Sequence, residues 1–329
     1  MKQAIYKTRG PVPQDVISAV TSEVPELTSG QVLVEVLAAP INPSDVLMLT
    51  GEYGMLPDLP AVGGSEGVGR VATVGPDVEG LPVGQMVLLP VGIGTWASHV
   101  VAPAKKLIPL PNEADAQQLS MISVNPPTAS LMLSEFVDLK PGDWVIQNVA
   151  NSGVGSYLTQ LAKIRGLKTV NVVRRESAVD GVKANGGDVV LVDGKDLAKR
   201  VKEAVGGEPI RLGIDAVGGS ATGRIADCLA VQGTVVTYGS MSGEPSVISA
   251  QATIFKDISL RGFWLAKWFQ LASKEKQMSV YGELTRLIAS GQLKTRIQAV
   301  YDVSDIKAAV KAATEGERDG KILVGKTSN

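Results

Sequence analysis

The sequence has very little cysteine, histidine or aromatic side chain: one Cys, Cys228, one His, His99, and 4% aromatic residues in 329. A lone cysteine cannot form an intrachain disulfide, which favours a reducing compartment. Structural zinc needs four soft ligands, and catalytic zinc usually draws on several Cys and His side chains. The composition therefore predicts that the chain binds no zinc. A Ser–His nucleophile is also disfavoured, because His99 lies in a strand-like run far from any Gly-x-Ser-x-Gly turn.

Membrane-length apolar runs, a signal-peptide pattern and an excess of one charge are missing as well. The first ten residues lead straight into a strand-like pattern, and no apolar run approaches the length that spans a bilayer. Lysine plus arginine (32) balance aspartate plus glutamate (33), so no basic field points to nucleic acid or an acidic membrane. With 44% hydrophobic residues the chain is expected to fold, as a cytoplasmic enzyme or binding protein.

The chain is long enough for two domains, and its patterning changes near residue 116. Before that point, short β-branched runs alternate with Gly and Pro, as at 32–39, 68–75 and 85–90. We expect a β-rich domain over 1–115, a second domain over 116–263, and a C-terminal segment over 264–329. This last segment has both helix and strand patterns and could return to the β-rich part.

Strand and helix patterns alternate in the second part. Apolar runs of buried-strand length occur at 144–149, 168–173, 188–192, 212–217 and 234–239, and helical stretches separate most of them. Val154, Leu158, Leu161 and Ala162 are spaced for one helix face, and Gly166 follows where a C-cap would lie. This alternation predicts an α/β domain, a doubly wound parallel sheet that is covered on both faces.

The turn after the first of these strands, residues 150–155, reads Ala-Asn-Ser-Gly-Val-Gly. A dinucleotide-binding turn uses three glycines for a tight turn, close approach to pyrophosphate, and helix–strand packing. Only Gly155 stands where that pattern expects a glycine. The helix N-terminus that follows would offer free N–H groups to a phosphate, and a plain strand–helix turn is the alternative.

The end of the second strand bears on the choice of cofactor. NAD-specific sites place an acidic residue there for the ribose 2′-hydroxyl, whereas this sequence has Arg174 and Arg175. Paired guanidinium groups suit a 2′-phosphate through charge-assisted hydrogen bonds. NADPH is therefore the expected cofactor, and a solvated charged loop is the alternative.

Five separated segments resemble the mitochondrial-type 2-enoyl thioester reductases, in the zinc-free branch of the medium-chain dehydrogenase/reductase superfamily. The resemblance extends over essentially the whole chain, and the segments are 41–71, 145–155, 171–175, 236–241 and 254–268. It implies a GroES-like catalytic domain and a Rossmann cofactor-binding domain. Zinc enzymes of the superfamily carry a ligand Cys before a Ser-Asp pair and a ligand His in Gly-His-Glu. Here the matching places read Ile-Asn-Pro-Ser-Asp at 41–45 and Gly-Ser-Glu at 64–66.

The resemblance implies NADPH-dependent reduction of trans-2-enoyl thioesters of coenzyme A or acyl carrier protein. Tyr53 corresponds to the proton-donating tyrosine of the family. Cofactor contacts are implied for Asn42, Asn125, Asn151, Ser152, Gly153, Val154, Arg174, Arg175, Tyr238, Gly239, Ser240, Met241, Phe263, Trp264, Leu265 and Lys321. Pro127 and Ser130 depart from the family pattern and put the preferred acyl chain length in doubt.

Other interpretations remain open from the sequence. Tyr53 could simply pack beneath a Gly/Pro-rich loop. An NADPH:quinone oxidoreductase or general alkene reductase of the same superfamily would not need its phenol, and a crystallin-like NADPH-binding protein would show no turnover. The family usually forms dimers through the edge of the cofactor-domain sheet, so a homodimer is expected through strands near 234–240 and 258–263.

Overall fold

The computed structural model describes residues 1–316, 318 and 320–326. They form two compact units, one of residues 1–124 with the described residues from Tyr281 onward, and one of Asn125–Val280. The sequence placed the boundaries at 115 and 263, and the units instead divide after Val124 and after Val280. No helix among the described residues is long and apolar enough to cross a membrane.

The first unit is built on β-sheets. Its strands are β1 (Lys2–Tyr6), β2 (Ile17–Thr21), β3 (Gln31–Pro40), β4 (Ala61–Val62), β5 (Val68–Val74), β6 (Met86–Leu88), β7 (His99–Pro103), β8 (Ile108–Pro109), β15 (Ile297–Tyr301) and β16 (Lys321–Gly325). Its helices are α1 (Pro13–Val16), α2 (Pro43–Thr50), η1 (Ala104–Lys106), α3 (Ala116–Leu119), η3 (Val303–Asp305) and α12 (Ile306–Thr314). A mixed sheet runs in the order β15-β16-β3-β5-β6-β8, with β7 also on β3, and β2-β1-β4 form a smaller one.

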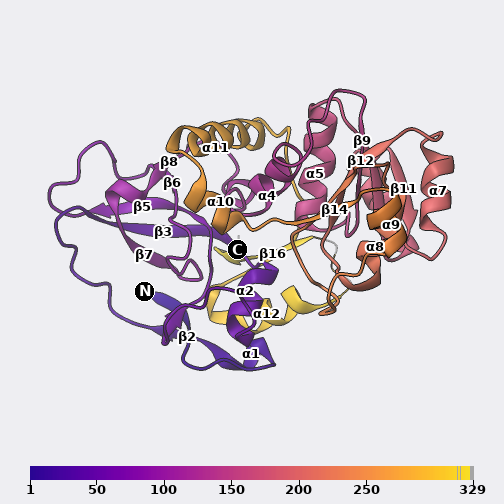
Figure 1. The fold of residues 1–329 in the computed structure, drawn as a ribbon. Coiled ribbons are helices and arrows are strands. Elements are labelled where there is room, and N and C mark those ends of the chain that lie inside the picture. The colour runs from indigo at the N-terminus through magenta and orange to yellow at the C-terminus, as the bar shows by residue number, and fades with distance from the viewer. Residues whose placement is uncertain (317, 319, 327–329) are drawn as a thin grey trace. The chain divides into compact units, whose positions relative to one another are not determined.

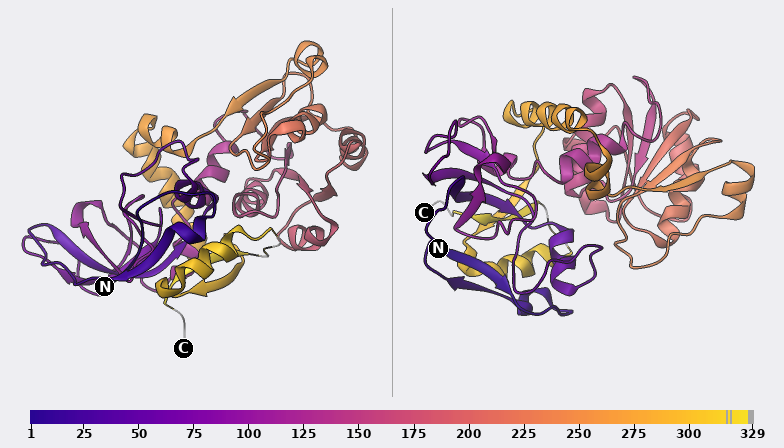
Figure 2. Two further views of the ribbon diagram at one scale, coloured as in Figure 1. Left: turned by 90° about the horizontal axis from the view of Figure 1, so that it is seen from below. Right: turned by 60° about the vertical axis from the view of Figure 1, so that its left-hand side comes forward.

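The C-terminal tail completes this first unit. β16 pairs antiparallel with β3, so that Leu323 faces Pro40, and β15 pairs parallel with β16. Figures 1 and 2 show the yellow helix α12 beside the indigo N-terminal elements α1 and β2. Val310 and Ile322 of the tail lie in one apolar core with Val34 and Trp96, all fully buried. Residues nearly 300 positions apart therefore share one core.

The second unit is the expected parallel sheet. Its elements are α4 (Asn125–Met132), β9 (Trp144–Gln147), α5 (Gly153–Ile164), β10 (Lys168–Val173), η2 (Glu176–Ala178), α6 (Val179–Ala184), β11 (Val189–Val192), α7 (Leu197–Ala204), β12 (Ile210–Asp215), α8 (Gly219–Cys228), β13 (Thr234–Thr237), α9 (Ala250–Phe255), β14 (Ser259–Gly262) and α10 (Leu265–Leu271). The strand order is β11-β10-β9-β12-β13-β14, and all pairs are parallel. Helix α11 (Lys274–Ala289) continues from this unit into the first.

Helices cover both faces of the parallel sheet. Residues of α7, α8 and α9, among them Leu197, Ile225 and Ala252, share one buried cluster with Ile146 and Val170 of the strands. Helix α5 lies on the other side of the sheet (Figure 1). The prediction of a GroES-like β-rich part and a doubly wound Rossmann part is confirmed. The sequence missed α2, because its eight residues lie among glycines and prolines and have little helical periodicity.

Candidate functional site

The turn of residues 150–155, which the sequence predicts to bind the cofactor, is called the cofactor turn below. It lies at the point where the parallel sheet reverses its strand order. The chain runs from β9 outward to β10 and β11, then returns to place β12 on the other side of β9. In open α/β sheets ligands bind outside the carboxyl ends of the strands at such a reversal. The turn of residues 148–152 follows β9 there and leads directly into α5.

Local contacts fix the shape of this turn. The Ser152 hydroxyl caps α5 and accepts the Gly155 amide N–H at 3.0 Å. A Cβ at Gly155 would lie 2.7 Å from the carbonyl oxygens of both Val149 and Ala150, a distance that real Cβ atoms do not adopt. Glycine is thus required where helix and strand approach each other, which is the role the sequence assigned to this position.

The other implied cofactor contacts also follow carboxyl ends of strands. Arg174 is exposed and Arg175 half-buried after β10, Tyr238–Met241 follow β13, and Phe263–Leu265 follow β14. The Tyr238 phenol lies close to the Ser152 side chain of the cofactor turn. Burial raises the pKa of Tyr238 to about 12, and Ser152 opposes this rise. Asn125 is buried at the start of α4 in the same unit.

Sequence reasoning missed a buried polar pair beside this turn. Asp215, at the end of β12, accepts hydrogen bonds from Asn148 Nδ2 at 2.5 Å and Thr222 Oγ1 at 2.7 Å. Asn148 in turn accepts the Ala216 N–H at 2.8 Å. The sequence did contain a sign of this pair, because a carboxylate stands inside the otherwise apolar run LGIDAV (212–217). The pair ties β9 to β12 at the reversal point and so holds the turn in place.

In the first unit, Tyr53 lies in the loop that follows α2. The helix ends at Gly51, which adopts a left-handed conformation (φ 89°) and donates its N–H to the Leu47 carbonyl at 2.9 Å. Tyr53 is half-buried two residues later. The helix begins at Asn42, whose backbone N–H donates to the Asp45 carboxylate at 2.8 Å.

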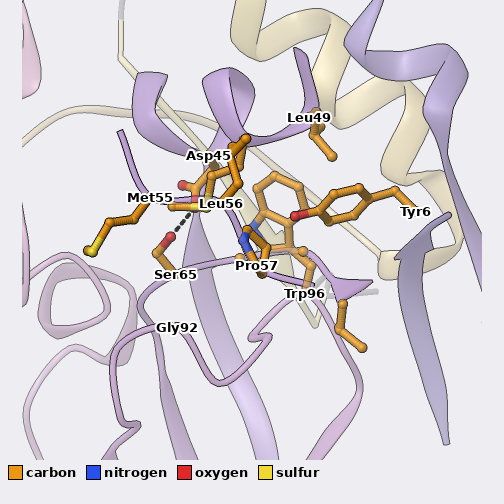
Figure 3. A pocket seen from close by; sticks show the side chains of 13 residues that line it. Tyr6, Asp45, Leu49, Met55, Leu56, Pro57, Ser65, Gly92 and Trp96 are labelled. Atoms are coloured by element: carbon orange, nitrogen blue, oxygen red, sulfur yellow. Dashed lines mark hydrogen bonds between the residues drawn. The ribbon is translucent and has the colours of Figure 1, made fainter. Parts of the chain in front are cut away.

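A cavity of about 270 Å³ lies beside this loop in the same unit. Its walls are mostly apolar and come from α2, from the loop beyond Tyr53 and from two glycine-rich turns (Figure 3). They include Tyr6, Asp45, Met48, Leu49, Met55, Leu56, Pro57, Val62, Ser65 and Trp96. Two of the lining residues are hydrogen-bonded to each other, since the Ser65 hydroxyl donates to the Asp45 carboxylate at 2.5 Å. Figure 3 marks this bond with a dashed line.

Asn42 and Lys321, both expected to contact the cofactor, lie together in a buried polar cluster. Lys321 Nζ donates to Asn42 Oδ1 at 2.5 Å, and Asn42 Nδ2 donates to Glu66 Oε1 at 2.7 Å. The second oxygen of Glu66 accepts the Ser123 N–H at 2.8 Å. We call Asn42, Asp45, Ser65, Glu66 and Lys321 the polar cluster. The sequence noted Asp45 and Glu66 only as neighbours of replaced zinc ligands.

Burial dominates the electrostatics of the polar cluster. Glu66 is fully buried and Asp45 and Lys321 nearly so. Desolvation raises the pKa of Glu66 to about 7 and raises that of Asp45, while it lowers the pKa of Lys321 to about 8. Asn42, Lys321 and Ser123 oppose the shift of Glu66, because their N–H groups and charge favour its anionic form.

The remaining residues singled out from the sequence have ordinary environments. His99 lies in β7, and its ring Nδ1 is 3.1 Å from the Ser98 hydroxyl. Cys228 is the last residue of α8 and is half-buried. Burial raises the pKa of its thiol to about 12, which makes it a poor nucleophile.

Two family models match the chain, one to each part. Residues 28–112 match the alcohol dehydrogenase GroES-like domain, and residues 153–286 match the zinc-binding dehydrogenase family. A relative from Rattus norvegicus, named mitochondrial enoyl-[acyl-carrier-protein] reductase, is 39% identical over 319 residues, which are 95% of this chain and 85% of the relative.

Solved structures resemble the whole chain. A proposed NADPH:quinone reductase of Bacillus thuringiensis has a TM-score of 0.89 at 28% identity, with 99% of each chain covered. The mitochondrial 2-enoyl thioester reductase Etr1p/Etr2p heterodimer of Candida tropicalis has a TM-score of 0.88 at 29% identity and the same coverage. A complex of Etr1p with NADP and crotonyl-CoA has a TM-score of 0.87 at 28% identity, again with 99% of each chain covered.

The expectation of a cytoplasmic protein is wrong on this comparison. Relatives from rat, Homo sapiens, Bos taurus and Arabidopsis thaliana are all named as mitochondrial enzymes. A single cysteine and the missing signal-peptide pattern do not distinguish one reducing compartment from another. Composition therefore gave no physical basis for choosing the cytoplasm.

Replacing Gly155 by Ala should distort the cofactor turn, because the new methyl group would meet two backbone carbonyls. We expect a loss of about 1–3 kcal/mol in the free energy of unfolding, typical of overpacking, and weaker NADPH binding. Urea unfolding and a fluorescence titration with NADPH measure the two effects. Gly181→Ala is the matched control, since nothing lies within 4 Å of its added Cβ. If the two variants were equally stable and bound NADPH equally well, the role of Gly155 in the cofactor turn would be contradicted.

Proposed function

Because the chain belongs to the enoyl-[acyl-carrier-protein] reductase family of medium-chain dehydrogenases/reductases, it is an NADPH-dependent 2-enoyl thioester reductase, and we propose that Tyr53 assists proton transfer. The reaction is assigned from the similarity of nearly the full chain to relatives that are named enoyl-[acyl-carrier-protein] reductase. The fold agrees with it in both units.

The reaction adds two hydrogens across a conjugated double bond. When bound, NADPH supplies the hydride that the β carbon of the enoyl thioester receives. The electron pair of the double bond moves onto the thioester oxygen as an enolate, and the α carbon then takes a proton. We propose that the Tyr53 phenol donates a hydrogen bond to the developing charge and delivers this proton, directly or through water. Its place in the loop beyond α2, next to the apolar cavity, supports this role.

We propose that the cofactor lies along the carboxyl ends of the parallel strands. The amides of Asn151–Val154 would hold the pyrophosphate at the start of α5, and Arg174 with Arg175 would hold the 2′-phosphate. Asn125, Tyr238–Met241 and Phe263–Leu265 would line the nicotinamide half. Asn42 and Lys321 of the first unit are proposed as cofactor contacts on the family resemblance alone. The glycine that the turn requires at 155 and the exposed cation at 174 support this fit.

We further propose that the reaction uses no zinc, although one matching family model is that of zinc-binding dehydrogenases. The residues at the two zinc-ligand segments do not fit the metal. Asp45 and Glu66 there already accept two hydrogen bonds each, and the ammonium of Lys321 is bound to the Asn42 oxygen. In the described part of the chain, no three His, Cys, Asp or Glu side chains are grouped to hold a metal.

A quinone reductase is the second candidate, favoured by the similarity of one quinone reductase structure to the whole chain. Hydride transfer to a conjugated enone needs no proton from Tyr53. NADPH oxidation with trans-2-enoyl-CoA and with a quinone, assayed in parallel, separates the candidates. Turnover with the quinone alone would assign the second.

We propose that the acyl group arrives on coenzyme A or acyl carrier protein, because both present the same conjugated thioester. We also propose that the protein is a homodimer joined through β14. This strand lies at the sheet edge with all four residues exposed, and Ile254 and Phe255 of neighbouring α9 are 70% and 77% exposed. An unpaired strand edge beside exposed apolar side chains is a favourable surface for self-association.

Replacing Tyr53 by Phe removes the phenolic proton and keeps the ring. If Tyr53 assists proton transfer, kcat with trans-2-enoyl-CoA should fall by more than ~10-fold. Steady-state kinetics at saturating NADPH give this number. Tyr301→Phe, at a half-buried tyrosine of β15, is the control and should retain full activity. A Tyr53→Phe enzyme of wild-type kcat would leave the tyrosine a packing role.

Replacing Arg174 and Arg175 by Gln should raise the KM for NADPH by roughly 10- to 100-fold, because charge-assisted hydrogen bonds to the 2′-phosphate are lost. The KM for NADH, which has no 2′-phosphate, should change little. The two cofactors are compared in the same enoyl-CoA assay. The double variant Lys199→Gln/Lys202→Gln, at two exposed lysines of α7, removes the same charge and is the control. A parallel rise in both KM values would show that the pair does not read the 2′-phosphate.

The Phe255→Glu variant should weaken the dimer at least ~10-fold, because a charge replaces a large apolar side chain at the self-association surface. Sedimentation or light scattering at micromolar concentration measures the dissociation. Val83→Glu, at an exposed valine of the first unit, is the control and should stay dimeric. A monomeric wild-type protein under these conditions would overturn the homodimer.

A further inference from the structure

The polar cluster joins three segments of the first unit that are distant in sequence. Asn42 and Asp45 come from the start of α2, Ser65 and Glu66 from the turn before β5, and Lys321 from the first residue of β16. The first two segments are those that carry the zinc ligands in zinc-dependent members of the superfamily. In this chain, a lysine from the C-terminal tail meets them.

Asn42 is the bridge in this arrangement. Its amide oxygen accepts the Lys321 ammonium at 2.5 Å, and its amide nitrogen donates to Glu66 at 2.7 Å. Lys321 also lies 3.4 Å from the Ile41 carbonyl. Two carboxylates and one ammonium are thus held out of water, where an unpaired charge would be costly. The cation compensates the carboxylates partly through the Asn42 amide.

We propose that the Lys321 ammonium is an internal replacement for the metal ion of the zinc-dependent branch: it is the fixed cation that holds segments 41–45 and 64–66 together and, through α2, positions Tyr53. This proposal rests on the catalytic role proposed for Tyr53. Lys321 would therefore act as a positioning residue for proton transfer, in addition to any contact with the cofactor.

The connection to Tyr53 runs through one short helix. Asn42 is the residue at which α2 begins, and the Asp45 carboxylate accepts its backbone N–H. The helix has only eight residues, and it ends at Gly51, two positions before Tyr53. Movement at its start is therefore transmitted to the Tyr53 loop, because a helix this short has no room to absorb it by bending.

Other charged and titratable groups also face the cluster. Arg318, on the segment before β16, is half-buried and lowers the pKa of Lys321, whereas Glu66 and Asp45 raise it. Tyr281 of α11 donates to the Ser123 carbonyl at 3.0 Å, and the nearby Glu66 adds to the rise that burial causes in the pKa of this phenol. Loss of the Lys321 charge would leave the two buried anions facing each other without their main counter-charge.

The test uses the full-length enzyme with Lys321→Met, Lys321→Arg and the double variant Lys321→Met/Glu66→Gln. Lys321→Met should lower kcat at saturating NADPH by ~10-fold or more, and Lys321→Arg should restore most of it. The double variant should recover part of the lost thermal stability, since it removes one anion with the cation. Lys106→Met, at an exposed lysine of the same unit, is the control and should change neither quantity.

A double-mutant cycle with Tyr53→Phe separates positioning from a purely structural role. If Lys321 acts through Tyr53, Lys321→Met should lower kcat less than ~2-fold in the Tyr53→Phe enzyme. Undiminished loss of kcat in that background would overturn the positioning role. A rise only in the KM for NADPH, with kcat and stability unchanged, would make Lys321 a cofactor contact alone and also overturn the proposal.

The thermal-stability measurements need no substrate. Their outcome therefore does not depend on whether the proposed reaction is correct. If Lys321→Met does not fold, Glu66→Gln alone keeps the test open. Burial raises the pKa of Glu66 from 4.5 to about 7, so the folded state holds its proton more tightly than the unfolded state. Wild-type stability should therefore fall relative to Glu66→Gln as pH rises from 4.5 to 7. A constant difference would contradict the buried charge cluster.

Discussion

Compensation of buried charge is the constraint on which the first unit depends. Asp45 and Glu66 lie out of water, and such carboxylates are tolerated only where donors and a counter-charge meet them. The chain satisfies this requirement with Asn42, Ser65 and Lys321, which come from a helix start, a turn and the C-terminal strand. The same hydrogen bonds therefore join the tail to the N-terminal segments and determine where α2 begins.

In the second unit, a small number of polar groups shape the cofactor turn. Parallel strands align their carboxyl ends, so residues that follow β9, β10, β13 and β14 gather along one edge of the sheet. Asn148 and Asp215 hold β9 and β12 together where the strand order reverses. These hydrogen bonds anchor the turn that leads into α5, and Gly155 allows the helix to approach the strand. A phosphate site can form there largely from backbone amides.

The two units differ in how much of their structure the sequence predicts. In the second unit, runs such as KTVNVV and the helix face of Val154, Leu158 and Leu161 carry local periodicity, and local periodicity predicts local structure. In the first unit the sequence did not predict α2, because this helix is short and lies among glycines and prolines. The polar cluster was also hidden, because its members are separated by up to 279 positions and no local pattern links Lys321 to Asn42.

The sequence by itself determined the two-part architecture, the parallel order of strand and helix, and the cofactor class suggested by Arg174 and Arg175. These depend on composition and on short-range patterns that every residue carries with it. Only the tertiary structure decided that Asn42, Glu66 and Lys321 share one buried site, that Tyr238 meets Ser152, and that the tail completes the N-terminal sheet. Such contacts arise when distant segments are packed together, and their energies depend on burial that no single segment has alone.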